Sequence, residues 1–440
     1  MSHVIGKTAS VCPVCLKTIP ADQVVGADGF IYMEKSCPEH GDFRTLIWEE
    51  SAAHYADWAA RDCHKPPTLP FAKPVENGCP NDCGLCDNHK QATCCTLLEL
   101  TNRCNLQCPV CFASAGEKEG KDLSLEEIGR QYDHLMSHGG PYNIQLSGGE
   151  PTMRDDLAEI IAMGKEKGFT FFQLNTNGVR LGIEDGYTDY LQQAGVSTVF
   201  MQFDGLDDAI YKVLRGKPLK EVKLKAIENC KKSGLPVVLV PTVAQGVNDH
   251  ALGEILLFAL SHAPHVRGVH FQPMSYFGRN SMDPSLGRLT IPRMLKNIEA
   301  QTNGLIKEAH FSGGGAESPY CSFHASYLKS CCSLKALPKR EGACCCQSSD
   351  TRDTVAQQWS GKASGCCCDA ENPTNALDAF LQKTVESTFT VSGMVFQDAW
   401  NLDLERLQRC YICEVDSTYG MVPFCAYNLT NSEGKALYRK

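Results

Sequence analysis

The sequence lacks long apolar runs. None of its hydrophobic segments approaches the ~18 to 20 residues that a membrane-spanning helix needs. Its first residues, MSHVIGKTASVCPVC, also contain no apolar signal core. We therefore expect a cytoplasmic protein without a transmembrane segment.

Positive charge is scarce relative to negative charge. The 42 Lys and Arg residues are outnumbered by 51 Asp and Glu residues, which gives a net charge of −9 and an isoelectric point of about 5.8. No basic stripe is present to neutralise phosphates, so nucleic acid is not expected as a partner. At 440 residues, 43% of them hydrophobic, the chain is long enough for one sizeable core and one or two smaller modules.

Cysteine, by contrast, is abundant. The chain has 25 cysteines, and many of them stand in adjacent pairs or triplets. Adjacent cysteines cannot easily reach separate disulfide partners. Because no export signal is expected either, metal ligation explains these residues better than a secreted disulfide framework.

The central part of the chain, residues 96–305, alternates short apolar runs with amphipathic stretches. This alternation is typical of βα units and a parallel sheet. Six parallel strands are expected, too few to close an eight-stranded barrel, so the pattern predicts an α/β fold with a partial barrel or an open doubly wound sheet. The expected strands are 96–101, 142–147, 169–175, 198–203, 236–242 and 268–274, and the expected helices are 125–136, 155–167, 187–194, 222–233 and 250–260.

Cysteine-rich extensions flank the central part on both sides. Residues 1–60 suit a small metal-binding module, and residues 61–95 form a loop-built linker. Residues 306–440 are expected to form a Cys-rich cap. Within it, the Gly/Ser/Cys-rich segment 306–370 is expected to be loosely structured unless a metal orders it, and a helix is expected over 375–385.

One cysteine motif directly follows the first expected strand. Cys104, Cys108 and Cys111 have C-x3-C-x2-C spacing and lie at the carboxyl edge of the sheet, where α/β folds place their sites. Three thiolates on a [4Fe-4S] cube leave one iron free to bind another molecule. The spacing alone is not decisive, because a chain this rich in cysteine forms such triads by chance.

The next strand ends in a second motif at the same edge of the sheet, Gly148-Gly149-Glu150-Pro151. Glycines allow a backbone to approach a ligand closely, and a carboxylate there accepts hydrogen bonds from a ligand ammonium group. The alternative is a Gly-Gly turn that simply leads into a helix. Two unrelated signals at one sheet edge favour the ligand site.

With these two motifs together, residues 96–305 resemble the radical S-adenosylmethionine (SAM) superfamily. The resemblance implies a partial (β/α)6 barrel, with a [4Fe-4S] cluster and SAM as cofactors and an electron donor such as ferredoxin or flavodoxin. One electron from the cluster would split SAM into methionine and a 5′-deoxyadenosyl radical, which abstracts hydrogen from a substrate. The cofactor-binding residues carried over by position are Phe112, Gly148, Gly149, Glu150, Pro151, Asn175, Asn177, Gln202 and Asp204.

Some of these positions have a plain structural alternative. Asn175 and Asn177, in QLNTNG, and Gln202 and Asp204, in QFDG, each stand at a strand end before a helix. Polar side chains at such places often cap the following helix instead of contacting a ligand. The QFDG pair is the weaker assignment of the two.

A closer resemblance extends through almost the whole chain. The succession CPVC…CPEHG, CPNDCGLCDNH, TNRCNLQCPVCF, SGGEP and PFCAYN resembles the tetraether-synthase-like branch, and PYNIQLSGGEPT, FQLNTNG and HFQPMSYFGR are more similar to a Cys-rich bacterial group that includes selenoproteins. This branch implies carbon–carbon or carbon–heteroatom bond formation on a lipid-like or small-molecule substrate, and some members have been discussed as methylating a pterin. The triplets 344–346 and 366–368 depart from the tetraether-synthase pattern and count against its lipid substrate.

Further cysteines suit additional metal centres. Cys12, Cys15, Cys37 and His40 have the ligand types and count of a closed structural zinc site. The resemblance suggests a rubredoxin-like single iron at this place, but the histidine favours zinc.

The linker repeats the C-x3-C-x2-C spacing at Cys79, Cys83 and Cys86. His89 or Cys94 would complete a four-ligand set, and the resemblance points to Cys94. Four protein ligands would make this an auxiliary electron-transfer cluster.

Near the end of the chain, Cys410, Cys413 and Cys425 are expected to help ligate an auxiliary [4Fe-4S] cluster facing the open side of the barrel. A turn at 418–420 would bring two short strands and their thiols together. Cys321, which matches a family position, or Cys332 would supply the fourth ligand. The alternative is a hairpin with buried, unliganded cysteines.

The remaining cysteines have less definite roles. Cys63 and Cys230 show no partner spacing and are expected to be ordinary buried thiols. The adjacent cysteines at 331, 332, 344–346 and 366–368 suit a thiophilic metal, a metalloid or redox exchange, unless they are a merely tolerated insertion.

A rival function from another class is a thiol-rich metal- or metalloid-binding redox protein that only stores and passes electrons. The motifs SGGEP and QLNTNG separate the two hypotheses, because an electron carrier does not need them.

Overall fold

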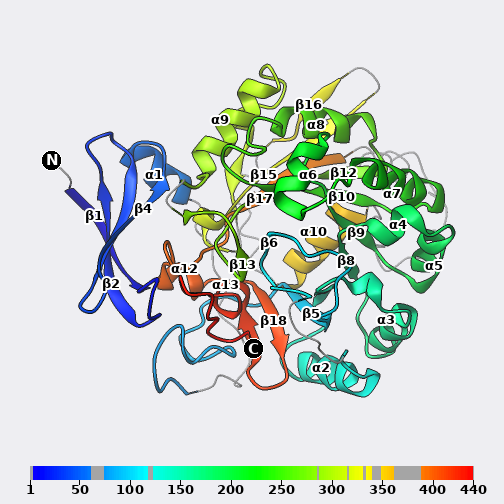
Figure 1. Ribbon diagram of the computed structural model, residues 1–440, viewed down its shortest axis with the longest axis horizontal. Helices are drawn as coiled ribbons and strands as arrows, with labels where there is room; N and C mark the ends of the chain where they lie inside the picture. Colours follow the sequence, from blue (N-terminus) through cyan, green and yellow to red (C-terminus); the bar gives the residue numbers. More distant parts are fainter. Residues whose placement is uncertain are drawn as a thin grey trace.

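The computed structural model describes residues 3–60, 74–116, 122–284, 287–314, 317–330, 333–338, 348–360 and 388–439. The helix expected over 375–385, Cys63, Cys332 and the adjacent cysteines at 331, 344–346 and 366–368 lie outside the described residues. Figure 1 shows a small antiparallel module beside a larger α/β body.

The N-terminal module is a four-stranded antiparallel sheet with the strands in chain order, followed by a short helix. The helix docks the module on the body: the rings of Tyr55 and Tyr320 stack with centroids 4.1 Å apart, and Trp58 Nε1 donates to the Pro319 carbonyl over 2.8 Å. The elements are β1 (His3–Val11), β2 (Thr18–Val25), β3 (Ile31–Cys37), β4 (Gly41–Trp48) and α1 (Ala52–Ala59).

The body is built on a large sheet whose central strands run parallel in the order β12-β10-β9-β8-β7-β5. All six strands were predicted, and the predicted radical SAM-type α/β architecture is confirmed. Most of their residues are buried, and the half-buried ones include Gln145, Phe200 and His270, which line the cavity described below. The strands are β5 (Cys95–Thr101), β7 (Asn143–Gly148), β8 (Phe172–Thr176), β9 (Thr198–Gln202), β10 (Val237–Val240) and β12 (Val266–Pro273).

The C-terminal residues extend this sheet on both sides. Strand β17 (Thr388–Met394) pairs in parallel with β12, and β18 (Ile412–Asp416) pairs in parallel with β5. Strand β18 then turns back into β19 (Gly420–Pro423), which confirms the predicted hairpin. The expectation of a cap separate from the 96–305 barrel is therefore revised, because residues after 387 supply strands of the same sheet.

The segment 306–370 was expected to be loosely structured, and for its described residues this was wrong. It contains β14 (Ser312–Gly313), β15 (Ser322–Lys329), β16 (Leu334–Ala336) and α10 (Ser348–Ser360). Strand β15 pairs antiparallel with β17 and buries alternate side chains toward the core. Its period-two pattern, SFHASYLK, was masked by the Gly/Ser/Cys-rich composition around it.

Helices cover the outside of the sheet (Figure 1). The five predicted helices are confirmed as α2 (Leu125–Ser137), α3 (Leu157–Glu166), α5 (Tyr187–Ala194), α7 (Lys220–Ser233) and α8 (Leu252–Ser261). Three more were not predicted: α4 (Val179–Ile183), α6 (Asp208–Arg215) and α9 (Ile291–Gln301). Helices α4 and α6 were missed because each is only one or two turns long, too short for a clear helical period.

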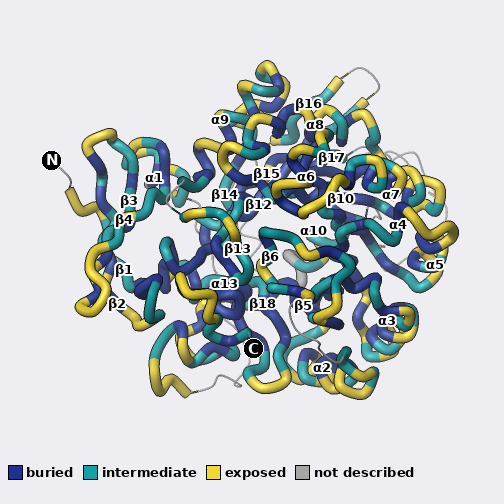
Figure 2. Tube along the Cα trace, in the orientation of Figure 1, coloured by how far each residue is buried: buried dark blue, intermediate teal, exposed yellow. Residues whose placement is uncertain are grey.

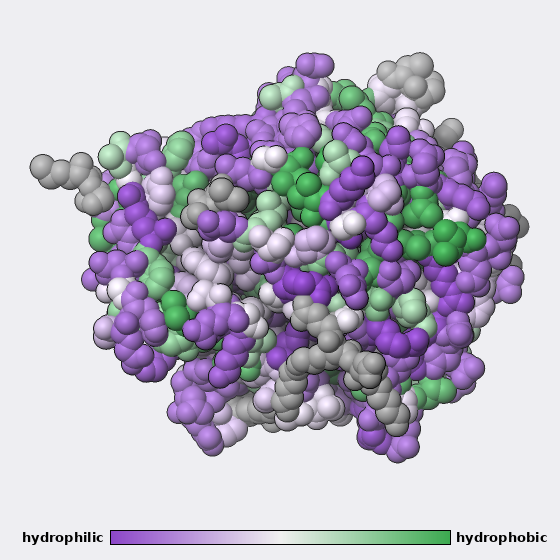
Figure 3. All heavy atoms as spheres, viewed as in Figure 1, coloured by the Kyte–Doolittle hydropathy of each residue, from purple (hydrophilic) through white to green (hydrophobic). Residues whose placement is uncertain are grey.

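Figure 2 shows that burial is concentrated on the sheet, while the outer helices and turns are exposed. On the face drawn in Figure 3, hydrophobic side chains are interspersed with a larger number of hydrophilic ones. Among the described residues, no helix has both the length and the apolar character needed to cross a membrane.

Candidate active site and metal centres

The cysteine triad lies in the loop after β5, where β6 (Val110–Cys111) pairs with β13 (Arg279–Asn280). Cys104, Cys108 and Cys111 are partly buried and line one cavity of about 450 Å³. The same cavity is lined by Gly148, Gly149 and Glu150 from the end of β7. The structure therefore brings the two sequence motifs together at the carboxyl edge of the sheet.

The triad fits a cluster better than a single metal ion. Burial, together with the neighbouring Glu150, Cys108 and Cys111, raises the pKa of the Cys104 thiol to about 12. Burial also raises the pKa of Cys108, which the guanidinium of Arg215 opposes. Yet the three sulfur atoms do not form a compact group with all ligand atoms within 4.8 Å of one another. These thiols are close enough to repel one another but too far apart to bind one ion. They are therefore suited to bind separate iron atoms of a cluster.

Arg279, which was not predicted as a site residue, stabilises the loop that carries the cysteine triad. Arg279 Nε donates to the Cys108 carbonyl over 2.7 Å, and Nη2 donates to the Ala115 carbonyl over 3.0 Å. The preceding Gly278 has φ +51°, and a Cβ there would lie 2.5 Å from the Phe112 carbonyl oxygen. The stretch HFQPMSYFGR, noted only as a family resemblance, thus holds the cysteine loop in place.

The two glycines at the end of β7 have a structural role beside the predicted ligand role. A Cβ on Gly148, whose φ is +119°, would lie 2.4 Å from the Thr101 carbonyl oxygen, and one on Gly149 would lie 2.3 Å from that of Arg103. Both distances are shorter than real Cβ contacts. The glycines allow β7 to approach the backbone that leads into the cysteine loop, so they join the two motifs before any ligand is considered.

Glu150 also has a structural role beside its expected ligand role. Its side chain is buried, and Oε1 accepts hydrogen bonds from the Thr152 amide (3.1 Å), the Thr152 hydroxyl (2.6 Å) and the Thr176 hydroxyl (2.7 Å). Oε2 accepts one, from the Asn177 amide over 2.7 Å. Glu150 therefore ties the ends of β7 and β8 together, and only Oε2 keeps capacity toward the cavity. Pro151 begins the 3-10 turn η1 (Pro151–Met153) and does not line the cavity.

The two predicted asparagines at the end of β8 have different hydrogen-bond partners. Asn175 and Asn177 both line the cavity. Asn175 Nδ2 donates to Gln145 Oε1 over 3.1 Å, whereas Asn177 Oδ1 accepts from the Val179 amide at the start of α4 over 2.9 Å. Asn177 Nδ2 reaches Asn105 of the cysteine loop over 2.7 Å. The capping alternative thus holds for Asn177, which also touches the cluster loop.

Gln202 and Asp204 differ in their position relative to the cavity. Gln202 lines the cavity, but Asp204 is fully buried and does not. Asp204 accepts both hydrogen bonds of a bidentate pair with Arg215, at 2.7 and 2.8 Å, and one from the Thr242 amide at 3.0 Å. The expected direct contact of Asp204 with SAM is therefore revised: it positions Arg215, which does line the cavity.

Two buried cations near this site were missed by sequence analysis. Burial opposes the charge of Arg215, but Asp204 outweighs it and raises the arginine's pKa. Lys223 of α7 is fully buried, and its Nζ donates to the Gln202 carbonyl (2.8 Å) and Gln202 Oε1 (2.7 Å) and to the Asn177 carbonyl. Burial lowers the pKa of Lys223 to about 7. In sequence, both look like solvated charges on an amphipathic helix, and no local signal distinguishes them.

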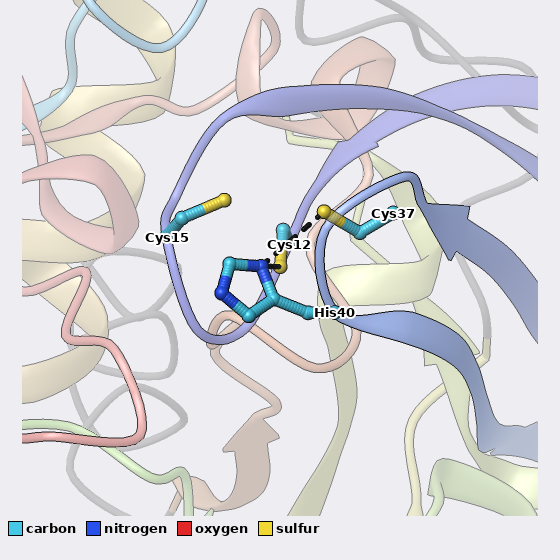
Figure 4. A group of neighbouring side chains, drawn as sticks. All are labelled: Cys12, Cys15, Cys37 and His40. Atoms are coloured by element: carbon cyan, nitrogen blue, oxygen red, sulfur yellow. Dashed lines mark hydrogen bonds between the residues drawn. The ribbon is translucent and has the colours of Figure 1, made fainter.

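The N-terminal module carries a compact ligand group (Figure 4). The ligand atoms of Cys12, Cys15, Cys37 and His40 all lie within 4.8 Å of one another. His40 Nδ1 is 3.4 Å from the Cys37 sulfur and 3.6 Å from that of Cys12. The amide of Glu39 lowers the pKa of Cys37 to about 6, which favours the thiolate that a metal requires. All four predicted ligands therefore converge as expected for a closed site.

Replacing Cys37 with Ala is expected to release about one metal ion per chain and to unfold the β1–β4 sheet, because a closed four-ligand site supplies much of the folding energy of so small a module. Elemental analysis for zinc and iron, with hydrogen exchange over residues 3–48, measures both effects. Cys230→Ala is the matched control, because it removes a buried thiol that belongs to neither metal group. Unchanged metal content in the Cys37 variant would refute the assignment.

The linker cysteines gather beside the C-terminal segment. The Cys83 thiol hydrogen-bonds to Cys79 and lowers its pKa, and Cys86 lies near Cys79. The Tyr438 hydroxyl accepts from the Cys83 amide over 2.9 Å and donates to the Pro80 carbonyl over 2.7 Å. This loop is therefore held by the far end of the chain.

The two candidates for the fourth ligand of this group lie in different surroundings. Cys94 lies beside Cys95 at the start of β5, lines the triad cavity and donates its amide to the Tyr411 carbonyl over 2.8 Å. The amide of His89 donates to the Cys86 carbonyl over 2.9 Å, and its Nε2 is buried without a hydrogen-bond partner among the described residues. His89 therefore stays a candidate ligand next to Cys86.

The C-terminal cysteines form another group. Cys410 lies close enough to Cys321 and Cys425 for their thiolates to repel. Cys321 accepts from Arg406 Nη2 over 3.4 Å, and Cys425 accepts from the Gln397 amide over 3.3 Å. Cys413 contacts the Thr93 hydroxyl over 3.5 Å and also lies close enough to Cys410 for their thiolates to repel. The other three predicted thiols thus lie around Cys410.

Two family models match the chain. The radical SAM superfamily matches residues 98–259, and the HMPTM N-terminal zinc ribbon domain matches residues 4–49. The second match agrees with the compact ligand group of the N-terminal module and favours zinc there over a rubredoxin-like iron.

Individual relatives give the same result. The chain is 46% identical over 310 residues to the 7,8-dihydro-6-hydroxymethylpterin dimethyltransferase of Methanocaldococcus jannaschii, covering 69% of this chain but only 60% of that protein. It is 35% identical over 184 residues to the Fe-coproporphyrin III synthase of Methanosarcina barkeri, covering 41% and 44%. Among solved structures, Streptococcus suis SuiB bound to S-adenosylmethionine aligns with a TM-score of 0.41 and 15% identity over 49% of this chain and 48% of that one.

A zinc ribbon followed by a radical SAM domain agrees with the dimethyltransferase relative, and these matches do not identify the tetraether-synthase-like branch. They agree with the cysteine triad and the GGEP strand end that the fold brings to one cavity. Residues 98–259 therefore match the radical SAM superfamily of enzymes, whose members use a [4Fe-4S] cluster and SAM.

Proposed function

We propose that this protein binds a [4Fe-4S] cluster through Cys104, Cys108 and Cys111, cleaves SAM reductively and activates a C–H bond of a small planar heteroaromatic substrate. The observation that carries the proposal is a single cavity shared by the triad, the GGEP strand end and a wall of polar and aromatic side chains. When bound, the reduced cluster supplies the electron that cleaves SAM, and a donor such as ferredoxin or flavodoxin would reduce it.

The protein's own residues prepare this chemistry in three ways. Arg279 and the close approach of Gly149 hold the cysteine loop against β7. Asp204 holds the guanidinium of Arg215 beside Cys108, where it opposes the rise in the pKa of that thiol that burial causes. The strands of the sheet line the cavity, so a bound substrate would be partly shielded from bulk water, which limits side reactions.

The cavity lining supports a heteroaromatic substrate over a lipid chain. Amide side chains offer donors and acceptors that suit the edge of a nitrogen heterocycle, and Gln145, Gln173 and Asn175 hold one another in place by hydrogen bonds. The likeness to a pterin dimethyltransferase makes a reduced pterin the first candidate. The amides that line the cavity are Gln145, Gln173, Asn175, Asn177, Gln202, Gln272 and Gln358.

Anaerobic reconstitution with iron and sulfide, followed by chemical reduction and detection of 5′-deoxyadenosine, tests SAM cleavage. No product from a properly assembled cluster would refute the proposal and favour the rival electron-carrier function. The substrate is tested separately with 7,8-dihydro-6-hydroxymethylpterin deuterated on carbon. Deuterium in the recovered 5′-deoxyadenosine supports the pterin, and its absence with normal SAM cleavage overturns only the substrate class.

We also propose that Cys321, Cys410 and Cys425 hold an auxiliary cluster. Three buried thiols at one place, two of them accepting N–H hydrogen bonds, fit cluster ligands. A Cys410→Ala, Cys425→Ala double variant is expected to lose about four iron atoms per chain, measured by iron analysis and Mössbauer spectroscopy. Cys230→Ala is the matched control, because that buried thiol lies in α7 and belongs to none of the cysteine groups. Equal iron in the double variant and the parent chain would show that these thiols are only structural.

A further inference from the structure

Helix α10 crosses the amino end of the partial barrel from the inside (Figure 1). Its first part is attached near the starts of β5 and β7, and its last turn reaches β9 and β12. The first attachment lies at the edge of the sheet opposite the cysteine loop, whereas Phe200 and His270 stand in the middle of their strands. Because α10 is the described part of the Cys-rich segment 331–370 that touches the cavity, it connects that insertion to the active site.

A single arginine anchors the helix. Arg352 donates to the Thr93 carbonyl at 3.0 and 3.3 Å, to the Gly139 carbonyl at 3.1 Å and to the Pro141 carbonyl at 2.7 Å. Its guanidinium also lies 4.2 Å from the ring centroid of Tyr142. All these acceptors are in the segments just before β5 and β7. Arg352 thereby satisfies carbonyl groups that the sheet leaves without partners at its amino edge.

The same face of α10 closes the cavity. Val355 and Trp359 lie three and seven residues after Arg352, spacings that place them on one side of a helix. Both line the cavity together with Gln358. Trp359 is buried and packs with Phe171 and Val238 in a small apolar cluster. The helix is therefore the floor of the cavity whose roof carries the cysteine triad.

Trp359 takes part in an aromatic corner at this floor. Its ring meets Phe200 edge to face, with centroids 5.3 Å apart at 85°, and lies 6.5 Å from His270 at 82°. His270 Nδ1 is 2.8 Å from the Ser392 hydroxyl, and burial lowers the pKa of His270 to about 4. The corner is thus uncharged near neutral pH. Trp359, Phe200 and Gln358 therefore present aromatic surface and an amide group to a flat, neutral heterocycle in the cavity.

We propose that α10 sets substrate specificity: Trp359 and Gln358 bind the distal ring of a planar heteroaromatic substrate and limit its depth, and Arg352 is the positioning residue that holds this floor in place. The inference rests on the proposed function, because it assigns part of that same cavity to the substrate. The cysteine triad and the SAM-contacting strand ends lie at the other end of the cavity. Changes in α10 should therefore alter substrate binding without altering SAM binding.

Calorimetric titration of the reconstituted protein with 7,8-dihydro-6-hydroxymethylpterin tests the binding role of Trp359. We expect Trp359→Ala to weaken binding about ten- to hundred-fold, the range found when a stacking aromatic is removed, and Trp359→Phe to change it only a few-fold. Affinity for SAM should stay unchanged in both variants. Trp400→Phe is the matched control, because Trp400 does not line the cavity.

The outcomes separate the two proposals. Normal pterin affinity in Trp359→Ala overturns the floor assignment and leaves the proposed function intact. A parent protein that cleaves SAM but does not bind the pterin overturns the substrate class, and with it this inference. Loss of SAM affinity in Trp359→Ala would also overturn the inference, since it would show a general structural defect.

The anchoring role of Arg352 has its own test. Arg352→Ala should abolish hydrogen-exchange protection over residues 352–360 and weaken pterin binding about as much as Trp359→Ala, with SAM affinity preserved. Arg352→Lys should restore part of both, because lysine keeps the charge over Tyr142 but loses the branched donor set. Unchanged protection in Arg352→Ala would refute the anchor.

Discussion

Replacing Cys108 with Ala is expected to abolish 5′-deoxyadenosine formation while leaving the protein folded. Cys108 is one of three thiols that the cavity offers to the cluster, and its loss removes one of the three anchored iron corners. The side chain is only partly buried and packs beside a small group formed by Leu106, Tyr211 and Leu219. Its removal therefore does not empty the main core.

The comparison for this variant is Cys230→Ala, which also deletes one thiol but from the interior of α7. Iron content, the absorbance of the reconstituted cluster and 5′-deoxyadenosine are measured for both proteins. We expect the Cys108 variant to lack activity and part of its iron, and the Cys230 variant to keep both at a modest cost in stability. Retained 5′-deoxyadenosine in the Cys108 variant would mean that the triad is misassigned.

Gly149→Ala is expected to have the second largest effect, a loss of cluster binding together with destabilisation by roughly 1–3 kcal/mol or more. The added Cβ would stand 2.3 Å from the Arg103 carbonyl oxygen. A backbone atom cannot rotate away as a side chain does, so the backbone at Arg103 and Cys104 must move. Because that displacement begins beside the first cluster ligand, we expect it to spread to the whole site.

Gly129→Ala in α2 is the matched control for this substitution. There the added Cβ meets only the flexible Met163 sulfur at 3.2 Å, and alanine favours a helix by up to about 1 kcal/mol over glycine. Urea unfolding and iron content of the two variants measure the difference. If Gly149→Ala reconstitutes as fully as Gly129→Ala, the close approach of β7 to the cluster loop is not needed for the site.

The sequence by itself determined the central architecture and the chemistry of the main motifs. Apolar runs separated by amphipathic stretches sufficed to place the six inner strands and five helices, because each element shows its period within a few residues. The triad, the GGEP strand end and the four ligands of the zinc ribbon were also found from sequence. In these motifs, ligand type and spacing are local, and a strand-end position implies the functional edge of the sheet.

Only the tertiary structure decided which distant residues meet. Strands β17 and β18 join the sheet more than 100 residues after the strands they pair with, and nothing local marks them as parallel partners. Arg215 and Lys223 look like surface charges until packing buries them under the cofactor site. The position of Cys94 has the same cause, since its amide bonds to the Tyr411 carbonyl next to β18, a pairing that spacing does not reveal.

The floor of the cavity shows this division most directly. Residues 348–360 have a weak helical pattern within a Gly/Ser/Cys-rich stretch, so composition predicted loose structure. Arg352 anchors the helix by donating hydrogen bonds to carbonyl groups of segments about 210 to 260 residues away in sequence. Local propensity selects elements with a strong period of their own. An element stabilised mainly by long-range hydrogen bonds and buried aromatic contacts becomes visible only once the sheet that supplies those partners has formed.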